Sequence, residues 1–169
     1  MHPVQNEAAL FLPEHELLVV ADLHIGIEYE LRKYGVYINS RVERLAERIK
    51  QIASKVKATK LLILGDVKHV IPSSPKYQQD ALIKFFHEIS KDMDVYMVPG
   101  NHDGGLKKIV EDISIFPSDG WFLEDMSVGF FHGHRWPNDH VVRCKTLVAA
   151  HTHPTVTLKD SFGYKFIEG

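Results

Sequence analysis

Short apolar runs alternate with amphipathic stretches in the first half of the chain. The segment AALFLPEHELLVVAD predicts two strands around a turn at Pro13–His15, and KLLILGD and DVYMVPG predict two further strands. Between the second and third of these strands, NSRVERLAERIKQIASKV repeats its apolar residues with the period of a helix. The apolar residues that share one face are Val42, Leu45, Ile49, Ile52 and Val56. Ser40 and Glu43 predict a capping box at the start of this helix.

A second helix is predicted in SSPKYQQDALIKFFHEISK, with Ser74 as its N-cap and Pro75 as its first helical residue. A short third helix is expected around residues 105–111. The remaining apolar runs have the pattern of strands: ISIF, WFLED, SVGFFHG, TLVAAH, TVTLKD and YKFIEG. A turn around residues 161–163 predicts that the last two runs form a hairpin.

The alternation of strand and helix in the first half predicts parallel strands, because parallel neighbours need a crossover connection. The strand-rich second half predicts a second or mixed sheet. The expected fold is therefore an α/β sandwich in which two sheets pack together and helices cover the outside.

Length and composition limit the class of protein. A chain of 169 residues predicts one domain, residues 1–169, with a core of ordinary size. The net charge of -2 gives no global electrostatic reason to bind a polyanion. The single cysteine, Cys144, is typical of a reducing compartment, so we expect a cytoplasmic protein. The N-terminus lacks the pattern of a signal peptide, and no apolar run approaches the ~18 residues of a membrane span, so no membrane partner is expected.

Residues that commonly bind metals follow five of the apolar runs. In chain order they are Asp22 and His24, then Asp66, then Asn101 with His102 and Asp103, then His132 with His134, and finally His151 with His153. Sites in α/β proteins form outside the carboxyl ends of strands, so parallel strands would bring these residues to one rim. If the D-x-H and H-x-H segments are strand-like, their two side chains also point to the same side.

Each cluster alone has an ordinary structural interpretation: the aspartates as caps, residues 101–103 as a turn, and the histidines as surface residues. Five such clusters, each at the end of a strand, make that interpretation poor. Carboxylate, imidazole and amide oxygen suit divalent metals, and the sequence has no set of thiolates for structural zinc. The ligand-type residues are too many for one ion, so two ions are expected.

The order D-x-H, G-D, G-N-H-D, H and H-x-H resembles the calcineurin-like metallophosphoesterase superfamily over the span from Asp22 to His153. The segments ADLHIG, GDVKH, GNHD and AHTHP are most similar to its archaeal ICC-like branch, which is related to the nuclease subunit of the double-strand-break repair complex. The resemblance implies a four-layer α-β-β-α sandwich of two mixed sheets flanked by helices. Ala150 stands where the superfamily usually has glycine, and its small methyl group predicts only a slight backbone adjustment.

Relatives in this branch continue past the final hairpin, so the resemblance implies that the last strands of the family are absent here. An apolar edge at residues 156–167 would then lack a partner strand. Because such edges pair with other chains, we expect a homodimer or a marginally stable protein.

The resemblance also implies a role for each clustered residue. The first metal would be held by Asp22, His24, Asp66 and His153, and the second by Asp66, Asn101, His132 and His151, with Asp66 as the bridge. His132 is preferred over His134 because the family places this ligand directly before a glycine. His134 is expected beside the ligands or facing the phosphate.

Three further residues are implied in catalysis. His102 would be the general acid for the leaving oxygen, with Asp103 fixing its orientation. His69, in GDVKH, matches a histidine of the repair nucleases and would meet the phosphate, although a loop histidine without this role is an equal alternative. The neighbouring Lys68 is expected at the surface, and the alternative is that it adds positive charge near the substrate. Trp136 is expected in core or rim packing.

These roles describe a dinuclear metal-dependent phosphoesterase. A hydroxide bridging the two ions would attack phosphorus in line, while the ions balance the negative charge. The expected substrate is a phosphodiester of a nucleotide or nucleic acid, and Mn²⁺ is the first expectation for the metal, ahead of Fe, Zn, Ni and Co. The alternative is a non-catalytic metal-binding scaffold of the same fold. Such scaffolds usually lack ligands or the acid histidine, whereas this chain has the full set, which favours the enzyme.

Overall fold

The computed structural model of the protein describes residues 1–69, 75–111, 113–153 and 157–168. Its largest sheet has six strands in chain order: β1 (His2–Pro3), β2 (Leu10–Leu12), β3 (Leu17–Val20), β4 (Lys60–Leu64), β5 (Asp94–Val98) and β6 (Ser114–Ile115). β2 is antiparallel to both β1 and β3, and β3 to β6 are parallel. In the parallel part Val20 pairs with Ile63 and Leu64 with Val98, so the carboxyl ends of β3, β4 and β5 meet at one edge of the sheet.

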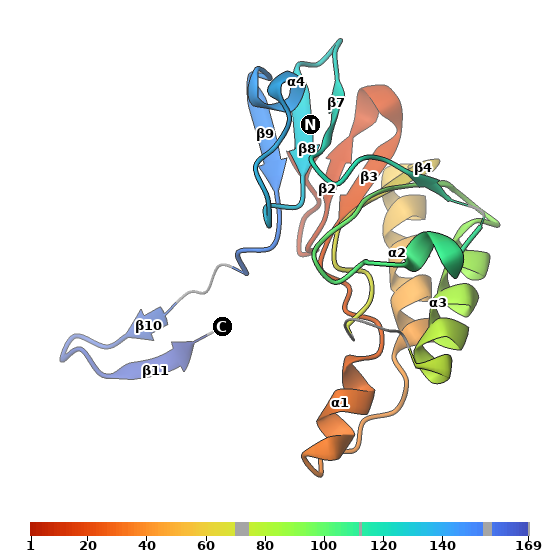
Figure 1. Ribbon diagram of the computed structural model, residues 1–169. Coiled ribbons are helices and arrows are strands. Elements are labelled where there is room, and N and C mark those ends of the chain that lie inside the picture. Colours follow the sequence, from red (N-terminus) through yellow and green to blue (C-terminus); the bar gives the residue numbers. More distant parts are fainter. Residues whose placement is uncertain (70–74, 112, 154–156, 169) are drawn as a thin grey trace.

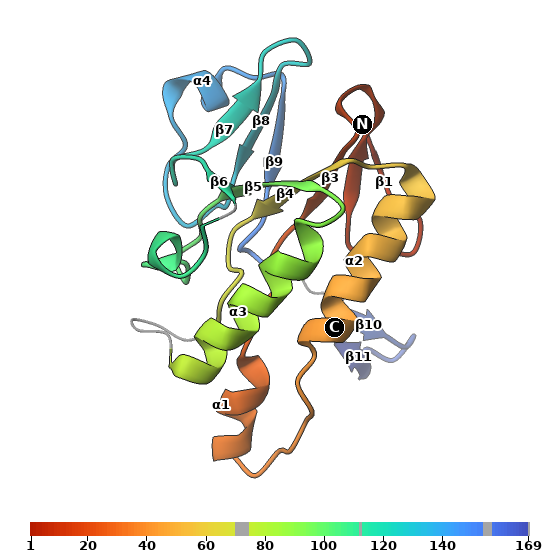
Figure 2. The same ribbon diagram turned by 90° about the vertical axis from the view of Figure 1, so that its right-hand side faces the viewer.

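Two long helices, α2 (Val42–Val56) and α3 (Lys76–Ile89), pack side by side over one face of this sheet (Figure 2). Their apolar residues form one core with the strands, as the helical period predicts, and this core includes Val42, Ile49, Ile63, Phe85 and Met97. A shorter helix, α1 (Ile27–Lys33), follows β3 and was missed from the sequence, because seven residues are too few to display an apolar period. Among the described residues, no helix combines the length and the apolar character needed to cross a membrane.

The helix starts differ from the predictions. Arg41 is the N-cap of α2 and no side chain caps this end; the Ser40 Oγ lies 3.5 Å from the Val42 nitrogen, a long separation for a hydrogen bond. Pro75 is the N-cap of α3 rather than its first helical residue, because its ψ of 155° is extended. The predicted cap Ser74 lies outside the described residues. The helix expected at 105–111 is a single 3-10 turn, η2 (Leu106–Lys108), and another 3-10 turn, η1 (Pro13–His15), makes the expected connection between β2 and β3.

A second sheet contains β7 (Trp121–Leu123), β8 (Val128–Phe131) and β9 (Thr146–Ala149), with β8 antiparallel to β7 and parallel to β9. Apolar residues from both sheets form a second core between them, including Leu17, Leu62, Val98 and Phe130. The one-turn helix α4 (Asp139–Val142) covers the outer face of this sheet, where a Cβ on Gly129 would lie 2.9 Å from the Val141 Cγ1. The layers are therefore helix, sheet, sheet and helix, which confirms the predicted four-layer sandwich.

The last two strands, β10 (Thr157–Lys159) and β11 (Lys165–Glu168), form an antiparallel hairpin that is a sheet of its own. Figure 1 shows this hairpin standing apart from both larger sheets. The Asp160 Oδ1 accepts hydrogen bonds of 2.9 Å from the backbone nitrogens of Phe162 and Tyr164 and closes the turn. The predicted final hairpin is confirmed.

Candidate metal centre

The five predicted clusters meet at the carboxyl ends of the strands, in loops joined by backbone hydrogen bonds. The backbone nitrogen of Asp22 donates to the Gly65 carbonyl over 3.1 Å, and that of His24 donates to the Asp66 carbonyl over 2.9 Å. These two bonds connect the loops after β3 and β4. From the second sheet, the Ala150 nitrogen donates to the His132 carbonyl over 3.0 Å. Because these bonds cross between loops, the clusters are held at one rim, as the strand pattern predicts.

The D-x-H and H-x-H segments are not strand-like, which corrects one step of the sequence argument. Both ligand-type residues of each segment have left-handed backbone conformations, with φ of 53° and 46° at Asp22 and His24, and 68° and 42° at His151 and His153. Asp66 also has a positive φ, 50°. Asp and His tolerate this region better than bulky residues do, although each such residue costs about 1–3 kcal/mol. The side chains converge because the backbone turns sharply after each strand.

The first cluster joins Asp66, His132 and His151, whose nearest ligand atoms lie within 4.8 Å of one another. The Nδ1 of the buried His132 ring lies 2.9 Å from the Leu64 carbonyl oxygen and donates its proton to it. The Nε2 lone pair is then free to bind a metal. This Nε2 lies 3.2 Å from the Asp66 Oδ2 yet makes no hydrogen bond within the described part of the chain. Two acceptor atoms facing each other at this distance suit a shared cation.

Two glycines allow this close approach. A Cβ on Gly65, which has a φ of 82°, would overlap the His132 ring. A Cβ on Gly100 would overlap the Asp66 carboxylate and lie 2.8 Å from the His132 Nε2. Larger residues at either position would therefore displace the ligand atoms.

The second cluster joins Asp22, His24 and His153 within the same 4.8 Å limit. The Asp22 Oδ1 lies 3.8 Å from the His153 Nε2. This oxygen and the His24 Nδ1 are both buried without a hydrogen-bond partner among the described residues. Burial also lowers the pKa of His24, which favours the neutral imidazole that a metal requires.

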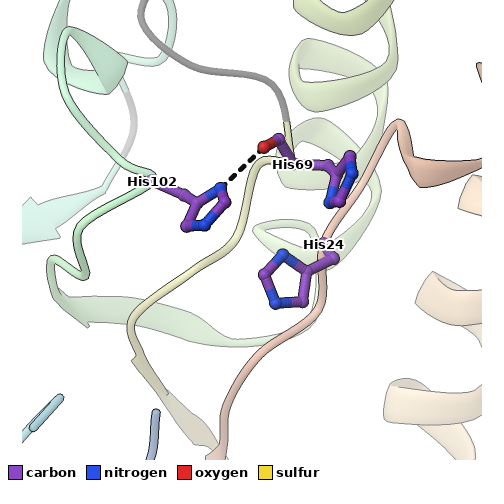
Figure 3. Close-up of side chains that lie close together, drawn as sticks. All are labelled: His24, His69 and His102. Atoms are coloured by element: carbon purple, nitrogen blue, oxygen red, sulfur yellow. Dashed lines mark hydrogen bonds between the residues drawn. The ribbon is translucent and has the colours of Figure 1, made fainter. Parts of the chain in front are cut away.

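A third cluster contains His24, His69 and His102 (Figure 3). The His102 Nδ1 lies 2.6 Å from the His69 carbonyl oxygen, and the His102 backbone nitrogen donates to the Asp66 Oδ1 over 2.9 Å. The His69 Nε2 lies 2.8 Å from an oxygen of Glu30, on α1. The contact between Glu30 and His69 could not be predicted from the sequence, because the helix that carries Glu30 was not predicted.

Asp103 does not orient His102, and this expectation was wrong. Its buried carboxylate, 4 % exposed, accepts backbone hydrogen bonds of 2.8 Å from Asp66, 3.0 Å from Val67, 3.3 Å from Lys68 and 2.8 Å from Gly100. The tight turn after β5 points the side chain back toward the β4 loop, so the His69 carbonyl orients His102 instead. The pKa of Asp103 is raised above its ordinary value because burial disfavours the charged carboxylate. The hydrogen bonds from Gly100 and Lys68 lower this pKa, but their effect is smaller than that of burial.

Two further expectations were wrong, and two residues remain as predicted candidates. Lys68 is 0 % exposed rather than at the surface, and Trp136 is 85 % exposed rather than packed. Asn101 is exposed in the loop that carries His102, and its role as an amide ligand stays a prediction. The His134 ring lies 5.4 Å from that of His132, between centroids, beside the first cluster rather than within it.

The donor set fits divalent metal ions. Carboxylates and imidazoles are ligands for Mn, Fe, Zn and similar ions, and they occur here without thiolates. Three buried atoms of the first two clusters have no hydrogen-bond partner in the described residues: the Asp22 Oδ1, the His24 Nδ1 and the His132 Nε2. Buried polar atoms are rarely left unpaired, and bound cations would satisfy these three.

Comparison with known proteins gives a family and a fold. The calcineurin-like phosphoesterase family model matches residues 15–168. The crystal structure of the nuclease MPE from Pseudomonas putida superposes with a TM-score of 0.65 and 24% identity, covering 94% of this chain and 70% of the nuclease. The phosphoesterase YfcE from E. coli gives a TM-score of 0.43 and 21% identity, with coverage of 72% and 62%. No curated protein matches the sequence.

Proposed function

The chain belongs to the calcineurin-like phosphoesterase family and is a metal-dependent hydrolase, and on this basis we propose that it is a dinuclear phosphodiesterase acting on a nucleotide or nucleic acid. The observation that carries the proposal is the division of the ligands into two adjacent groups, Asp66 with His132 and His151, and Asp22 with His24 and His153. Two groups of three ligands at one rim suit two ions, with Asp66 shared between them and Asn101 added to the group of Asp66, His132 and His151.

The metals and the protein residues have separate tasks. Two bound divalent ions supply an activated water and positive charge for the phosphoryl oxygens. The chain's own contribution is to hold the ligands in place and to deliver a proton. His102 is the proton donor. The His69 carbonyl oxygen accepts a hydrogen bond from the His102 Nδ1. The His102 Nε2 is therefore directed toward the metal ligands and lies 4.0 Å from the Asp66 Oδ2.

His69 is proposed to contact the phosphate. Its Nε2 lies 2.8 Å from a Glu30 oxygen, and this contact holds the ring beside His24 and His102. A ring held in this place would donate an N–H hydrogen bond to the substrate phosphate. The structural pairing with Glu30 supports this role over that of a loop histidine without function.

The substrate class and the setting are also proposals. A diester is favoured over a monoester by the sequence resemblance, and MPE, the neighbour in fold, is described as a nuclease. Mn²⁺ is the first candidate for both ions. The single cysteine, Cys144, supports a cytoplasmic location, and the β10–β11 hairpin standing apart from the sheets supports a homodimer built through that edge.

The test is metal content followed by turnover. The Mn²⁺-loaded chain is expected to contain two ions and to hydrolyse bis(4-nitrophenyl) phosphate faster than 4-nitrophenyl phosphate. Two bound ions without turnover of either ester or of a dinucleotide would support the alternative, a non-catalytic scaffold. At most one weakly bound ion would overturn the dinuclear site.

A further inference from the structure

A cavity of about 430 Å³ opens beside the second ligand cluster and has no part in the chemistry described so far. Its lining comes from the loop after β3, the start of α1, the start of α2 and His153. Three of its residues belong to the metal centre: Asp22, His24 and His153. A group bound in the cavity would therefore be attached to, or adjacent to, the phosphate at the metals. The volume lies in the ~300–1,000 Å³ range of small-molecule sites.

The walls of the cavity are apolar, and its two other polar residues have opposite charges. Leu23, Ile25, Ile27, Val42 and Leu45 supply the apolar surface. Arg41, the exposed N-cap of α2, and Glu28, in the first turn of α1, supply the charges. The cavity is thus suited to a flat apolar group with a polar edge.

Glu28 is the decisive residue. It is 2 % exposed, and its Oε1 is buried without a hydrogen-bond partner among the described residues. An unpaired buried carboxylate oxygen is costly, so a residue of this kind in a cavity wall points to a ligand that donates a hydrogen bond. Helix capping does not account for this oxygen, because the Glu28 Oε1 accepts no backbone N–H in the part of the chain that the structure describes.

We infer that this cavity binds the nucleobase of the substrate, with Glu28 accepting a hydrogen bond from its N–H edge. The inference rests on the proposed function. Guanine is the best match, because it presents two adjacent N–H donors to a carboxylate, whereas uracil flanks its one N–H with carbonyl oxygens that repel it. Arg41 lies at the same cavity and stacks on the base or contacts a neighbouring phosphate. A cationic head group such as ethanolamine would also pair with Glu28, but it fills little of the volume and is repelled by Arg41.

The test is binding by the Mn²⁺-loaded chain of residues 1–169, measured by calorimetry with GMP, UMP and phosphoethanolamine. These ligands share a phosphate, so the metals contribute to all three and the differences come from the cavity. GMP is expected to bind about tenfold more tightly than UMP, and Glu28→Gln is expected to remove most of this preference. Glu43→Gln, a change on the exposed surface of α2 outside the cavity lining, is the matched control and should keep it.

A second variant covers the case in which Glu28→Gln fails to fold. Leu45→Trp fills the cavity from α2, so it should weaken GMP and UMP alike, toward the affinity of inorganic phosphate. Three results would overturn the inference. The first is equal affinity of the wild type for GMP and UMP, and the second is a preference for GMP that survives both variants. The third is tighter binding of phosphoethanolamine than of GMP. Binding needs no turnover: a GMP preference in a protein that hydrolyses no diester would overturn the proposed function and leave the base site standing.

Discussion

His151 and His153 are separated by one residue and lie in different ligand clusters, His151 with Asp66 and His132, and His153 with Asp22 and His24. The left-handed conformations of both residues let neighbouring side chains diverge in this way. We therefore predict that His151→Ala and His153→Ala each weaken the binding of a different ion, by at least the ~10–100-fold typical of altered metal-site partners. Equilibrium dialysis with Mn²⁺ measures the two affinities, and His140→Ala, at an exposed residue of α4, is the control. Loss of the same ion in both variants would contradict the division.

Asp66→Asn should weaken the binding of both ions. The Asp66 Oδ2 faces the His132 Nε2 at 3.2 Å and the His102 Nε2 at 4.0 Å, so this carboxylate lies at the centre of the site. An amide keeps the shape but loses the charge that a bridging ligand supplies. Elemental analysis after dialysis should find fewer than one ion per chain, and retention of one full ion would show that Asp66 serves a single metal.

His102→Ala should keep both ions and lose activity in a way that depends on the leaving group. A nitrophenolate leaves readily as an anion, whereas a ribose alkoxide needs a proton. Hydrolysis of a dinucleotide should fall by ~10²–10⁴-fold, and that of bis(4-nitrophenyl) phosphate by much less. Steady-state kinetics on the two substrates make the comparison. Equal losses on both would indicate that His102 positions the metal or the phosphate and donates no proton.

Asp103→Asn should destabilise the fold itself. The carboxylate accepts four backbone N–H bonds, from Asp66, Val67, Lys68 and Gly100, and an asparagine has one acceptor oxygen and an NH₂ group that would face these donors. The free energy of unfolding should fall by about 2–4 kcal/mol. Urea unfolding of the metal-free protein measures it, with Asp125→Asn, whose side chain is 63% exposed, as the control. A change of less than about 0.5 kcal/mol, as at an ordinary surface site, would show that these hydrogen bonds are dispensable.

The burial of Lys68 should make the free energy of unfolding depend on pH. Burial lowers the pKa of Lys68, so between this lowered value and the unfolded pKa of about 10.4 the unfolded chain carries a proton that the folded chain has released. Stability contributed by this group therefore rises with pH through that window and is lowest below it. Lys68→Met should remove the rise, which urea unfolding of the metal-free proteins at neutral and alkaline pH will detect. Parallel stability curves for the two proteins would contradict the effect.

The strands, the two long helices and the order of the ligand clusters could be predicted from the sequence. Each strand is a short apolar run, and each cluster follows such a run directly, so its place at the rim depends only on local pattern and on the parallel direction of β3, β4 and β5. The family resemblance, and not the H-x-H pattern, implied that His151 and His153 bind different ions; the two residues lie in different clusters, and their assignment to two ions stays a prediction.

Tertiary structure decided what each polar side chain contacts. Asp103 accepts hydrogen bonds from backbone groups more than 30 positions away in the chain. His69 pairs with Glu30, which lies on α1, a helix too short to be recognised in the sequence. Lys68 looks like a surface residue in the sequence, and its burial follows from the packing of loops that lie far apart in the chain. Local periodicity specifies which face of an element is apolar, but the partner of a polar group depends on long-range approach. The apolar pattern therefore determined where the site forms, and only the assembled loops determined how its residues are oriented.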